Sequence, residues 1–233
     1  MDLPFWNLWK AKCLIDGAIS SLNDGLIFDD LRLQNQERIG GFKSGAPTDG
    51  RSVITLDQLV GEGQRFGSVY ADPPWRYENR ASRGAAENHY DTMSVDAIAS
   101  LPVAKLVAEQ AHLHLWTTNA FLFEAIKVIE AWGFSYKSCL IWIKPQFGNG
   151  NYWRLSHEFL LLGVRGSLTF SDNAQQSWLV AERTKHSAKP RVFRRLIESV
   201  SPGPRLELFA RNQAEGWTTW GNEIQPDLFD SVL

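Results

Sequence analysis

The sequence predicts an α/β domain built on a largely parallel sheet with helices on both faces. Short apolar runs of strand length alternate with segments of helical periodicity from about residue 51 onwards. Turns rich in glycine and proline separate these segments. The 233 residues are enough for one core. Sheets of this kind bind ligands at the carboxyl ends of their strands, so residues that follow an apolar run are the first candidates for a site.

Residues 1–50 differ from the rest, because they are rich in Asn, Asp, Gln and Gly. We expect an N-terminal arm, mostly loop, with one short helix around residues 5–21. Residues 51–224 are then the folded domain, and residues 225–233 are a C-terminal tail.

Five apolar runs are expected to be strands. A helix is expected at 120–132, where Asn119 could cap the start and Gly133 would close the end. A second helix is expected at 189–200, because Pro190 suits its first turn and its apolar residues form one stripe. The predicted strands are GSVYA (67–71), HLHLWTT (112–118), SCLIWIK (138–144), EFLLLGV (158–164) and RLELFA (205–210).

Composition and charge exclude several classes of protein. Apolar residues make up 44% and charged residues 21%, with a formal net charge of −2, which does not suit a protein that grips long duplex DNA by charge alone. No apolar run approaches the length of a bilayer span, and polar residues interrupt the first fourteen positions, so we expect no membrane association and a cytoplasmic location. The two cysteines, Cys13 and Cys139, form neither a disulfide framework nor a metal cluster, and we expect no metal site.

The tetrad Asp72, Pro73, Pro74 and Trp75 directly follows the first predicted strand. An aromatic amine such as the exocyclic nitrogen of adenine is a poor nucleophile, because its lone pair is delocalised into the ring. The Asp72 carboxylate and the Pro73 carbonyl could accept its two N–H groups and aim the lone pair outward, while the indole of Trp75 could stack on the base. The alternative is an acidic residue and a proline turn that merely end a strand, with Trp75 packed.

DPPW after an apolar strand resembles the catalytic signature of the adenine-N6 methyltransferases. This family includes the catalytic subunit of the eukaryotic messenger-RNA adenosine methyltransferase and bacterial and phage relatives. The resemblance covers about residues 52–224 and implies a Rossmann-like fold with S-adenosyl-L-methionine as methyl donor. It also implies a permuted motif order, in which the catalytic loop precedes most cofactor-binding residues. The further segments that carry it are HYDTMS (89–94), LWTTN (115–119), IWIKP (141–145), HEFLLLGVRG (157–166), HSAKP (186–190), SPGPRLELFAR (201–211) and GWTTWGNE (216–223).

The resemblance assigns cofactor-binding roles to six residues. Lys189 matches the lysine that pairs with the cofactor carboxylate, and Asp72 belongs to the same pocket. Glu207 in its apolar strand requires a partner, either a ligand or a salt bridge. The nearby arginines 191, 194 and 195 we interpret as a solvated basic face of the helix. The cofactor set is Asp72, Lys189, Glu207, Arg211, Asn222 and Glu223.

Two polar loops are expected to frame the substrate. One spans residues 76–91 and holds Tyr90, and the other spans residues 145–158. In the second loop, aromatic side chains beside an arginine could hold a nucleotide, or could fold the loop onto the protein. His157 and Glu158 could hold the target base, the alternative being a salt bridge at the start of a strand. The substrate set is Tyr90, Trp153, Arg154, His157 and Glu158, with Tyr152 beside Trp153.

The tail QPDLFD resembles the short peptide with which bacterial proteins dock into the replicative sliding clamp. Its contacts would come from Gln225, Asp227, Leu228 and Phe229, although Leu228 and Phe229 could instead pack on the domain.

The sequence therefore predicts an adenine-N6 methyltransferase acting on nucleic acid, with DNA favoured over RNA. The alternatives are an RNA adenine methyltransferase, a cytosine-amine methyltransferase and a non-catalytic subunit of a methyltransferase complex. The modest net charge also leaves room for a homodimer or a heterodimer.

Overall fold

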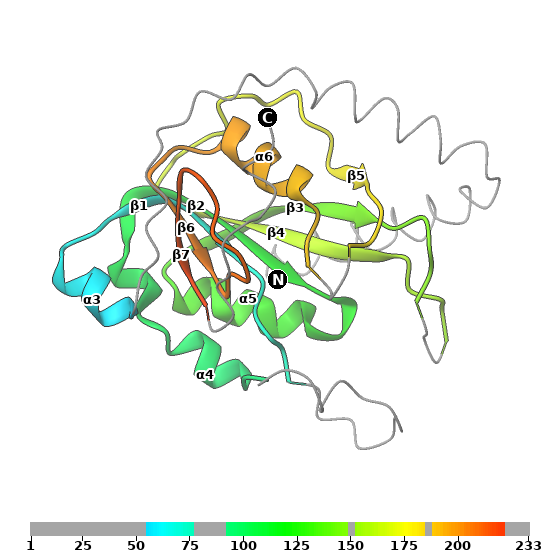
Figure 1. The fold of residues 1–233 in the computed structure, drawn as a ribbon, viewed down its shortest axis with the longest axis horizontal. Helices are drawn as coiled ribbons and strands as arrows, with labels where there is room; N and C mark the ends of the chain where they lie inside the picture. Colours follow the sequence, from blue (N-terminus) through cyan, green and yellow to red (C-terminus); the bar gives the residue numbers. More distant parts are fainter. Residues whose placement is uncertain (1–54, 77–91, 149–151, 185–187, 222–233) are drawn as a thin grey trace, which may run out of the picture.

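A computed structural model describes residues 55–76, 92–148, 152–184 and 188–221, which form one seven-stranded sheet flanked by helices (Figure 1). The strands are β1 (Phe66–Ala71), β2 (Val107–Thr117), β3 (Ser135–Ile143), β4 (His157–Arg165), β5 (Trp178–Val180), β6 (Arg205–Leu208) and β7 (Trp217–Trp220). The helices are α3 (Leu56–Gly61), α4 (Val95–Ala99), α5 (Leu122–Ala131) and α6 (Arg191–Val200), with 3-10 turns η2 (Pro102–Lys105) and η3 (Asn119–Phe121). The five strands expected from the sequence are all present, whereas β5 and β7 were not predicted.

The strand order is β5-β3-β4-β2-β1-β6-β7, and the sheet is largely parallel as expected. Only β4 runs against its neighbours β2 and β3, and the other adjacent pairs are parallel. Because β4 is reversed, its first residues lie at the edge where the parallel strands end. Glu158 pairs with Trp142 in register, one residue before β3 ends.

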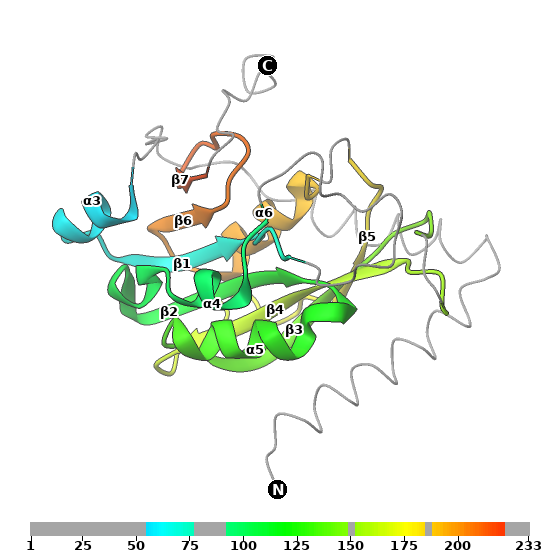
Figure 2. The same ribbon diagram turned by 90° about the horizontal axis from the view of Figure 1, so that it is seen from below.

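The two faces of the sheet are covered by different helices. Helices α4 and α5 lie on one side and α6 on the other, with α5 against β2 and β3 (Figures 1 and 2). Successive side chains of a strand point to opposite faces, so Val69 and Ala71 join the core with α4 and α5, while Tyr70 joins the core with α6. This confirms the expected two-sided α/β architecture.

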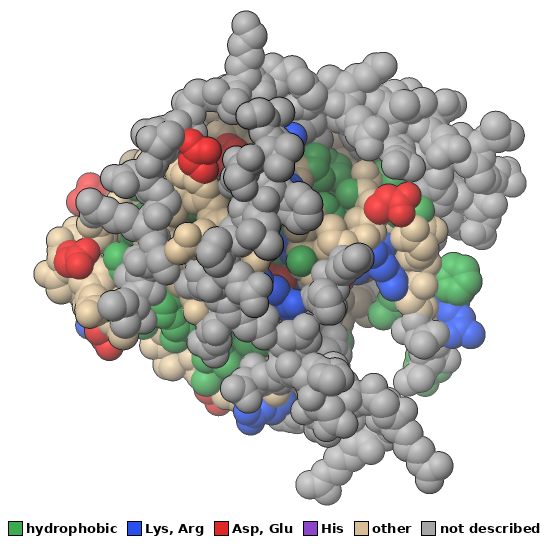
Figure 3. Space-filling model, viewed as in Figure 1, with side chains coloured by type: hydrophobic (Ala, Val, Ile, Leu, Met, Phe, Trp, Pro, Cys, Tyr) green, Lys and Arg blue, Asp and Glu red, His purple; other side chains and the backbone are tan. Residues whose placement is uncertain are grey.

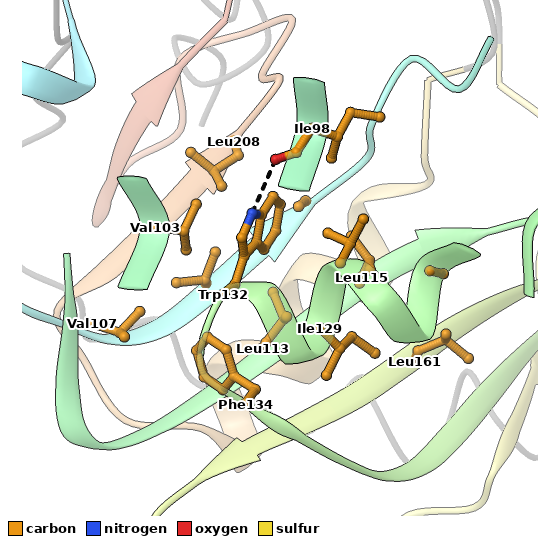
Figure 4. Close-up of a cluster of buried hydrophobic side chains, with 14 of the residues drawn as sticks. Ile98, Val103, Val107, Leu113, Leu115, Ile129, Trp132, Phe134, Leu161 and Leu208 are labelled. Carbon is orange, nitrogen blue, oxygen red and sulfur yellow. Dashed lines mark hydrogen bonds between the residues drawn. The ribbon is translucent and has the colours of Figure 1, made fainter. Parts of the chain in front are cut away.

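The larger core is centred on the indole of Trp132, which is fully buried at the end of α5 (Figure 4). Its Nε1–H donates to the backbone carbonyl of Ile98 at 3.0 Å, which ties α4 to α5. The ring lies among aliphatic side chains of both helices and the sheet, including Leu113 and Leu208. The indole therefore buries a large apolar surface while keeping its one polar group paired.

Helix α5 differs from the prediction at its start but not at its end. Asn119 does not cap the helix: it is the first residue of η3, and α5 begins three residues later without a side-chain cap. The extra 3-10 turn supplies the backbone bond from Phe121 N–H to Thr118 O instead. Gly133 closes the helix as expected, with a φ of +81° that suits glycine.

Helix α6 packs on the opposite face through the apolar stripe read from the sequence. Phe193, Leu196, Ile197 and Val200 are buried, and Pro190 lies one residue before the first helical turn. Across the described residues, every helix is too short or too polar to cross a bilayer.

Candidate active site

The tetrad 72–75 lies directly after the carboxyl end of β1, near the middle of the sheet. The backbone folds back on itself there, because Trp75 N–H donates to Pro73 O at 2.9 Å. Pro74 O accepts from Met93 N–H at 2.8 Å, which fastens the turn to the segment before α4. The turn is therefore rigid, as the two prolines predict. The Pro73 carbonyl already has one donor, which leaves it a second lone pair for a ligand.

Trp75 holds this turn in place. Its indole is 8% exposed and stacks on Phe121, with ring centroids 5.4 Å apart and an interplanar angle of 18°. Its Nε1–H donates to the backbone carbonyl of Trp116 at 3.1 Å. The expectation that this ring stacks on a base therefore needs correction, because burial and the contact with Phe121 leave little of it for a ligand. The structure assigns Trp75 to anchoring the turn on β2.

Asp72 is paired with Lys189, although 117 positions separate the two residues. The Lys189 ammonium lies 2.7 Å from both carboxylate oxygens, and the side chains are 12% and 26% exposed for Lys189 and Asp72. Lys189 also lies over the Trp116 ring, 5.3 Å from its centroid. Burial disfavours the charged ammonium, but the Asp72 and Glu158 carboxylates outweigh it and raise the pKa of Lys189. The residue carried over as the cofactor lysine and the catalytic aspartate are thus direct neighbours.

Glu158 continues this cluster on the reversed strand β4. One of its oxygens lies 3.4 Å from the Lys189 ammonium, and the other forms an ion pair with Lys144 at the end of β3. Burial raises the pKa of Glu158, but the two lysines outweigh it and the net direction is downward. The salt bridge left open for Glu158 is therefore present. Lys144 was not predicted, and the signal that could have found it is a lysine directly following the buried end of an apolar strand.

Glu207 forms the salt bridge that the sequence left as one of two alternatives. Both of its oxygens accept from the Arg194 guanidinium, at 2.7 to 3.0 Å, and the residue is 8% exposed. Burial opposes the charge on Arg194, but the Glu207 carboxylate outweighs it and raises the pKa of Arg194. Arg194 is therefore a largely buried structural partner, and its interpretation as part of a solvated face was wrong. The described contacts assign Glu207 to this pair.

The strand that carries Glu207 ends in an unusual backbone conformation. Phe209, the residue after β6, has a φ of +60°, which is an outlier for a bulky side chain. Such strain is characteristic of functional sites, and this residue lies at the same edge of the sheet as the tetrad. Arg211 follows and is half-buried. The cofactor candidates Asn222 and Glu223 lie outside the described residues.

The segment between β3 and β4 is a hairpin extension that carries aromatic side chains. Its base is closed by two backbone bonds, from Lys144 N–H to Ser156 O at 2.7 Å and from Gly148 N–H to Leu155 O at 2.6 Å. Tyr152 is 95% exposed and Trp153 is 84% exposed. Arg154, between Trp153 and Leu155, is exposed as well. Of the two alternatives, the structure does not show the aromatic pair folded onto the protein.

The space-filling view shows the same arrangement from the outside. Hydrophobic and basic side chains project together at the right of the molecule, where the hairpin lies in Figure 1 (Figure 3). Acidic and basic side chains also lie next to one another near the middle of this face (Figure 3).

Of the remaining predicted site residues, the structure describes only His157. His157 begins β4, is half-buried, and packs edge-on against Phe159 with centroids 5.0 Å apart. Tyr90 lies outside the described residues, as do the arm 1–50 and the tail with Gln225, Asp227, Leu228 and Phe229. Their predicted roles stay predictions.

The charged cluster fits one end of S-adenosylmethionine. The amino-acid end of that molecule carries a carboxylate and an ammonium group. Lys189 offers a buried cation and Asp72 offers an adjacent, partly exposed carboxylate, at the carboxyl edge of parallel strands. The ammonium of Lys189 therefore suits the carboxylate of that end, and the Asp72 carboxylate lies beside it at the edge where the methyl acceptor would bind.

The matches to known proteins cover most of the folded part of the chain. A sequence model of the MT-A70 family matches residues 66–223. The Type II methyltransferase M.MunI of Mycoplasma sp is 31% identical over 186 residues, which cover 70% of this chain and 79% of that protein. A putative N(6)-adenosine-methyltransferase MT-A70-like protein of Medicago truncatula is 32% identical over 174 residues, which cover 69% of this chain and 26% of that protein. The human N(6)-adenosine-methyltransferase catalytic subunit METTL3 is 31% identical over 173 residues, which cover 69% of this chain and 28% of that protein. The matches to these plant and human proteins thus span only about a quarter of their length.

Proposed function

This chain belongs to the MT-A70 family of adenine-N6 methyltransferases, and from that premise we propose that it transfers a methyl group from S-adenosylmethionine to the N6 amine of adenine in DNA. The observation that carries the proposal is the meeting of Asp72 and Lys189 at 2.7 Å. The family's catalytic turn and its cofactor lysine come from parts of the chain that are 117 positions apart. Their contact at the carboxyl edge of the sheet is what a donor and an acceptor site in one place require.

The tetrad supplies the acceptors for the target amine. The Asp72 carboxylate and the second lone pair of Pro73 O would each accept one N–H, which directs the nitrogen lone pair away from the ring. S-adenosylmethionine, when bound, supplies an electrophilic methyl group on sulfur. Transfer of that methyl group would leave S-adenosylhomocysteine and a positively charged N6, which would then release its proton to water. Asp72 stabilises that developing charge.

Lys189 and the turn position the two reactants and do not transfer a proton. Lys189 would hold the cofactor carboxylate, which leaves Asp72 to accept the adenine amine. Trp75 fixes the turn through its bond to Trp116 O. Holding two reactants in line converts a bimolecular step into an effectively unimolecular one, which suits a reaction with a weak nucleophile.

The exposed hairpin residues are the proposed contacts with the nucleic acid. Tyr152 and Trp153 present aromatic faces on which bases can stack, and Arg154 adds a positive charge for phosphates. Within a duplex the target adenine must be turned out of the stack to reach the tetrad. The relative named Type II methyltransferase M.MunI favours DNA. The relatives named adenosine methyltransferases make RNA the alternative.

The test is a methyl-transfer assay with four substrates. The full chain is incubated with tritiated S-adenosylmethionine and, separately, single- and double-stranded DNA and RNA, and the labelled nucleoside is identified after digestion. The proposal expects N6-methyldeoxyadenosine, and Asp72→Ala should give none while keeping cofactor binding close to wild type. Label in N6-methyladenosine alone would move the substrate to RNA. Label in cytidine, or in no nucleoside, would end the adenine proposal.

A further inference from the structure

The Lys189 ammonium occupies the oxygens that the reaction needs. It lies 2.7 Å from Oδ1 and 2.7 Å from Oδ2 of Asp72. A carboxylate held in this way by a cation is a weakened acceptor for a neutral amine, because its charge is already compensated. The side-chain arrangement seen here therefore weakens Asp72 as an acceptor for the target base.

Lys189 cannot simply move into solvent or into an apolar space. Its side chain is 12% exposed, and a buried cation without an anionic partner is strongly disfavoured. The nearby Asp72 and Glu158 carboxylates raise its pKa, so it remains charged at neutral pH. It can leave Asp72 only if other anions take over its charge.

Glu158 is one such anion, and it is already close. Its Oε2 lies 3.4 Å from the ammonium, longer than the contacts to Asp72. Lys144 pairs with the other oxygen of Glu158 and lies over the Trp142 ring, 4.3 Å from its centroid. The second carboxylate is thereby fixed on the paired strands β3 and β4, while the first is on the turn after β1. Lys189 thus has two defined anionic neighbours from separate parts of the fold.

We propose that Lys189 is a charge gate on Asp72: without cofactor it blocks the catalytic carboxylate, and a carboxylate group entering the site draws it away, with Glu158 retaining part of its charge. The inference rests on the proposed function, in which the entering carboxylate is the amino-acid end of the cofactor. It couples the two binding steps, because Asp72 accepts the adenine amine more strongly once the cofactor site is filled. Linkage then requires each ligand to raise the affinity for the other by the same factor.

The experiment measures binding without turnover. The dissociation constant of a fluorescein-labelled oligodeoxyadenylate is determined by anisotropy with the full chain. It is measured alone, with saturating S-adenosylhomocysteine, and with 5′-methylthioadenosine, which lacks the amino-acid carboxylate; calorimetry establishes saturation for both nucleosides. S-adenosylhomocysteine should tighten binding about tenfold, within the usual range of coupling between two sites. Methylthioadenosine should not, and neither nucleoside should affect an oligonucleotide with purine, which lacks the amine, in place of adenine.

A variant tests the gate directly. Lys189→Met removes the blocking charge, so its affinity for the oligodeoxyadenylate without any nucleoside should equal that of the wild type with S-adenosylhomocysteine. Arg195→Met is the matched control, because it removes one positive charge from an exposed position of α6. It should keep the full dependence on S-adenosylhomocysteine. The wild-type comparisons stand even if Lys189→Met fails to fold.

Two results would overturn the gate. One is equal affinity for oligodeoxyadenylate with and without S-adenosylhomocysteine, and the other is a folded Lys189→Met protein that still needs S-adenosylhomocysteine for tight binding. Methyl transfer to adenine without this coupling would reject the gate and leave the proposed function intact. The absence of methyl transfer on all four substrates would reject the proposed function instead.

Discussion

Replacing Arg194 with methionine tests whether the pair with Glu207 is structural. The substitution keeps an apolar stem and removes the guanidinium, so the Glu207 carboxylate loses hydrogen bonds of 2.7 to 3.0 Å. Breaking a buried pair from one side costs about 3–5 kcal/mol. The side chains of Arg194 and Glu207 keep 18% and 11% of their surface, so we expect the lower end, about 3 kcal/mol off the free energy of unfolding. For a chain of this size that lowers Tm by about 6–12 °C.

The assay is urea unfolding followed by tryptophan fluorescence at pH 7.5. Arg195→Met, on the exposed face of the same helix, should stay within about 0.5 kcal/mol of the wild type. Adding Glu207→Gln to Arg194→Met should restore most of the loss, because the buried group is then neutral. The deficit of the single variant should also shrink towards pH 5, since an uncompensated Glu207 takes up a proton on folding. A loss below about 1 kcal/mol for Arg194→Met would refute the structural assignment of the pair.

Three further predictions concern the turn, the core and the hairpin. Trp75→Phe keeps the stacking on Phe121 but leaves Trp116 O without its donor, so we expect about 1–3 kcal/mol lower stability in urea; unchanged stability would contradict the anchoring role. His114 is buried. Burial is the main cause that lowers its pKa to about 3, and the neighbouring His112 lowers it further. Its contribution to stability is therefore complete above pH 6.5 and declines as the pH falls towards 3. Relative to His114→Gln, we expect the free energy of unfolding of the wild type to fall by about 2 kcal/mol between pH 7.5 and pH 5. If the stability of both proteins changes with pH at the same slope, this role of His114 is wrong. Trp153→Ala should weaken single-stranded oligonucleotide binding by about 1–3 kcal/mol in anisotropy without lowering Tm; unchanged binding would remove Trp153 from the interface.

Local patterns were sufficient to predict much of the fold. Most of the predicted strands are long or strongly apolar, and the stripe on residues 192–200 has one periodicity that only a helix satisfies. The reversal of β4 was not predicted, because an apolar run such as EFLLLGV has the same composition in either direction. The edge strands β5 and β7 have three and four residues and were missed, because pairing rather than intrinsic pattern makes them strands.

The site was predictable where a residue's role depends on its neighbours in sequence. Asp72 follows a buried strand directly, and its position at the carboxyl edge follows from that alone. The partners across the fold were not predictable from the sequence alone: Arg194 looked like a surface residue because its helix also carries exposed arginines. Trp75 looked available for stacking because the sequence does not show Phe121 beneath it. The roles of Arg194 and Trp75 depend on contacts with residues distant in the sequence, and only the tertiary structure shows these contacts.

The central claim is that Asp72 holds the adenine amine in line with an activated methyl group. Single-turnover transfer from labelled S-adenosylmethionine to an adenine oligonucleotide tests it most directly, with wild type and Asp72→Asn compared at saturating cofactor. The substitution preserves shape and removes the negative charge, and removing one such electrostatic contact typically costs about 10²–10³ in rate. We expect a loss of that size in N6-methyldeoxyadenosine formation, with S-adenosylhomocysteine bound no more weakly than by the wild type. A wild-type rate in Asp72→Asn would contradict the claim.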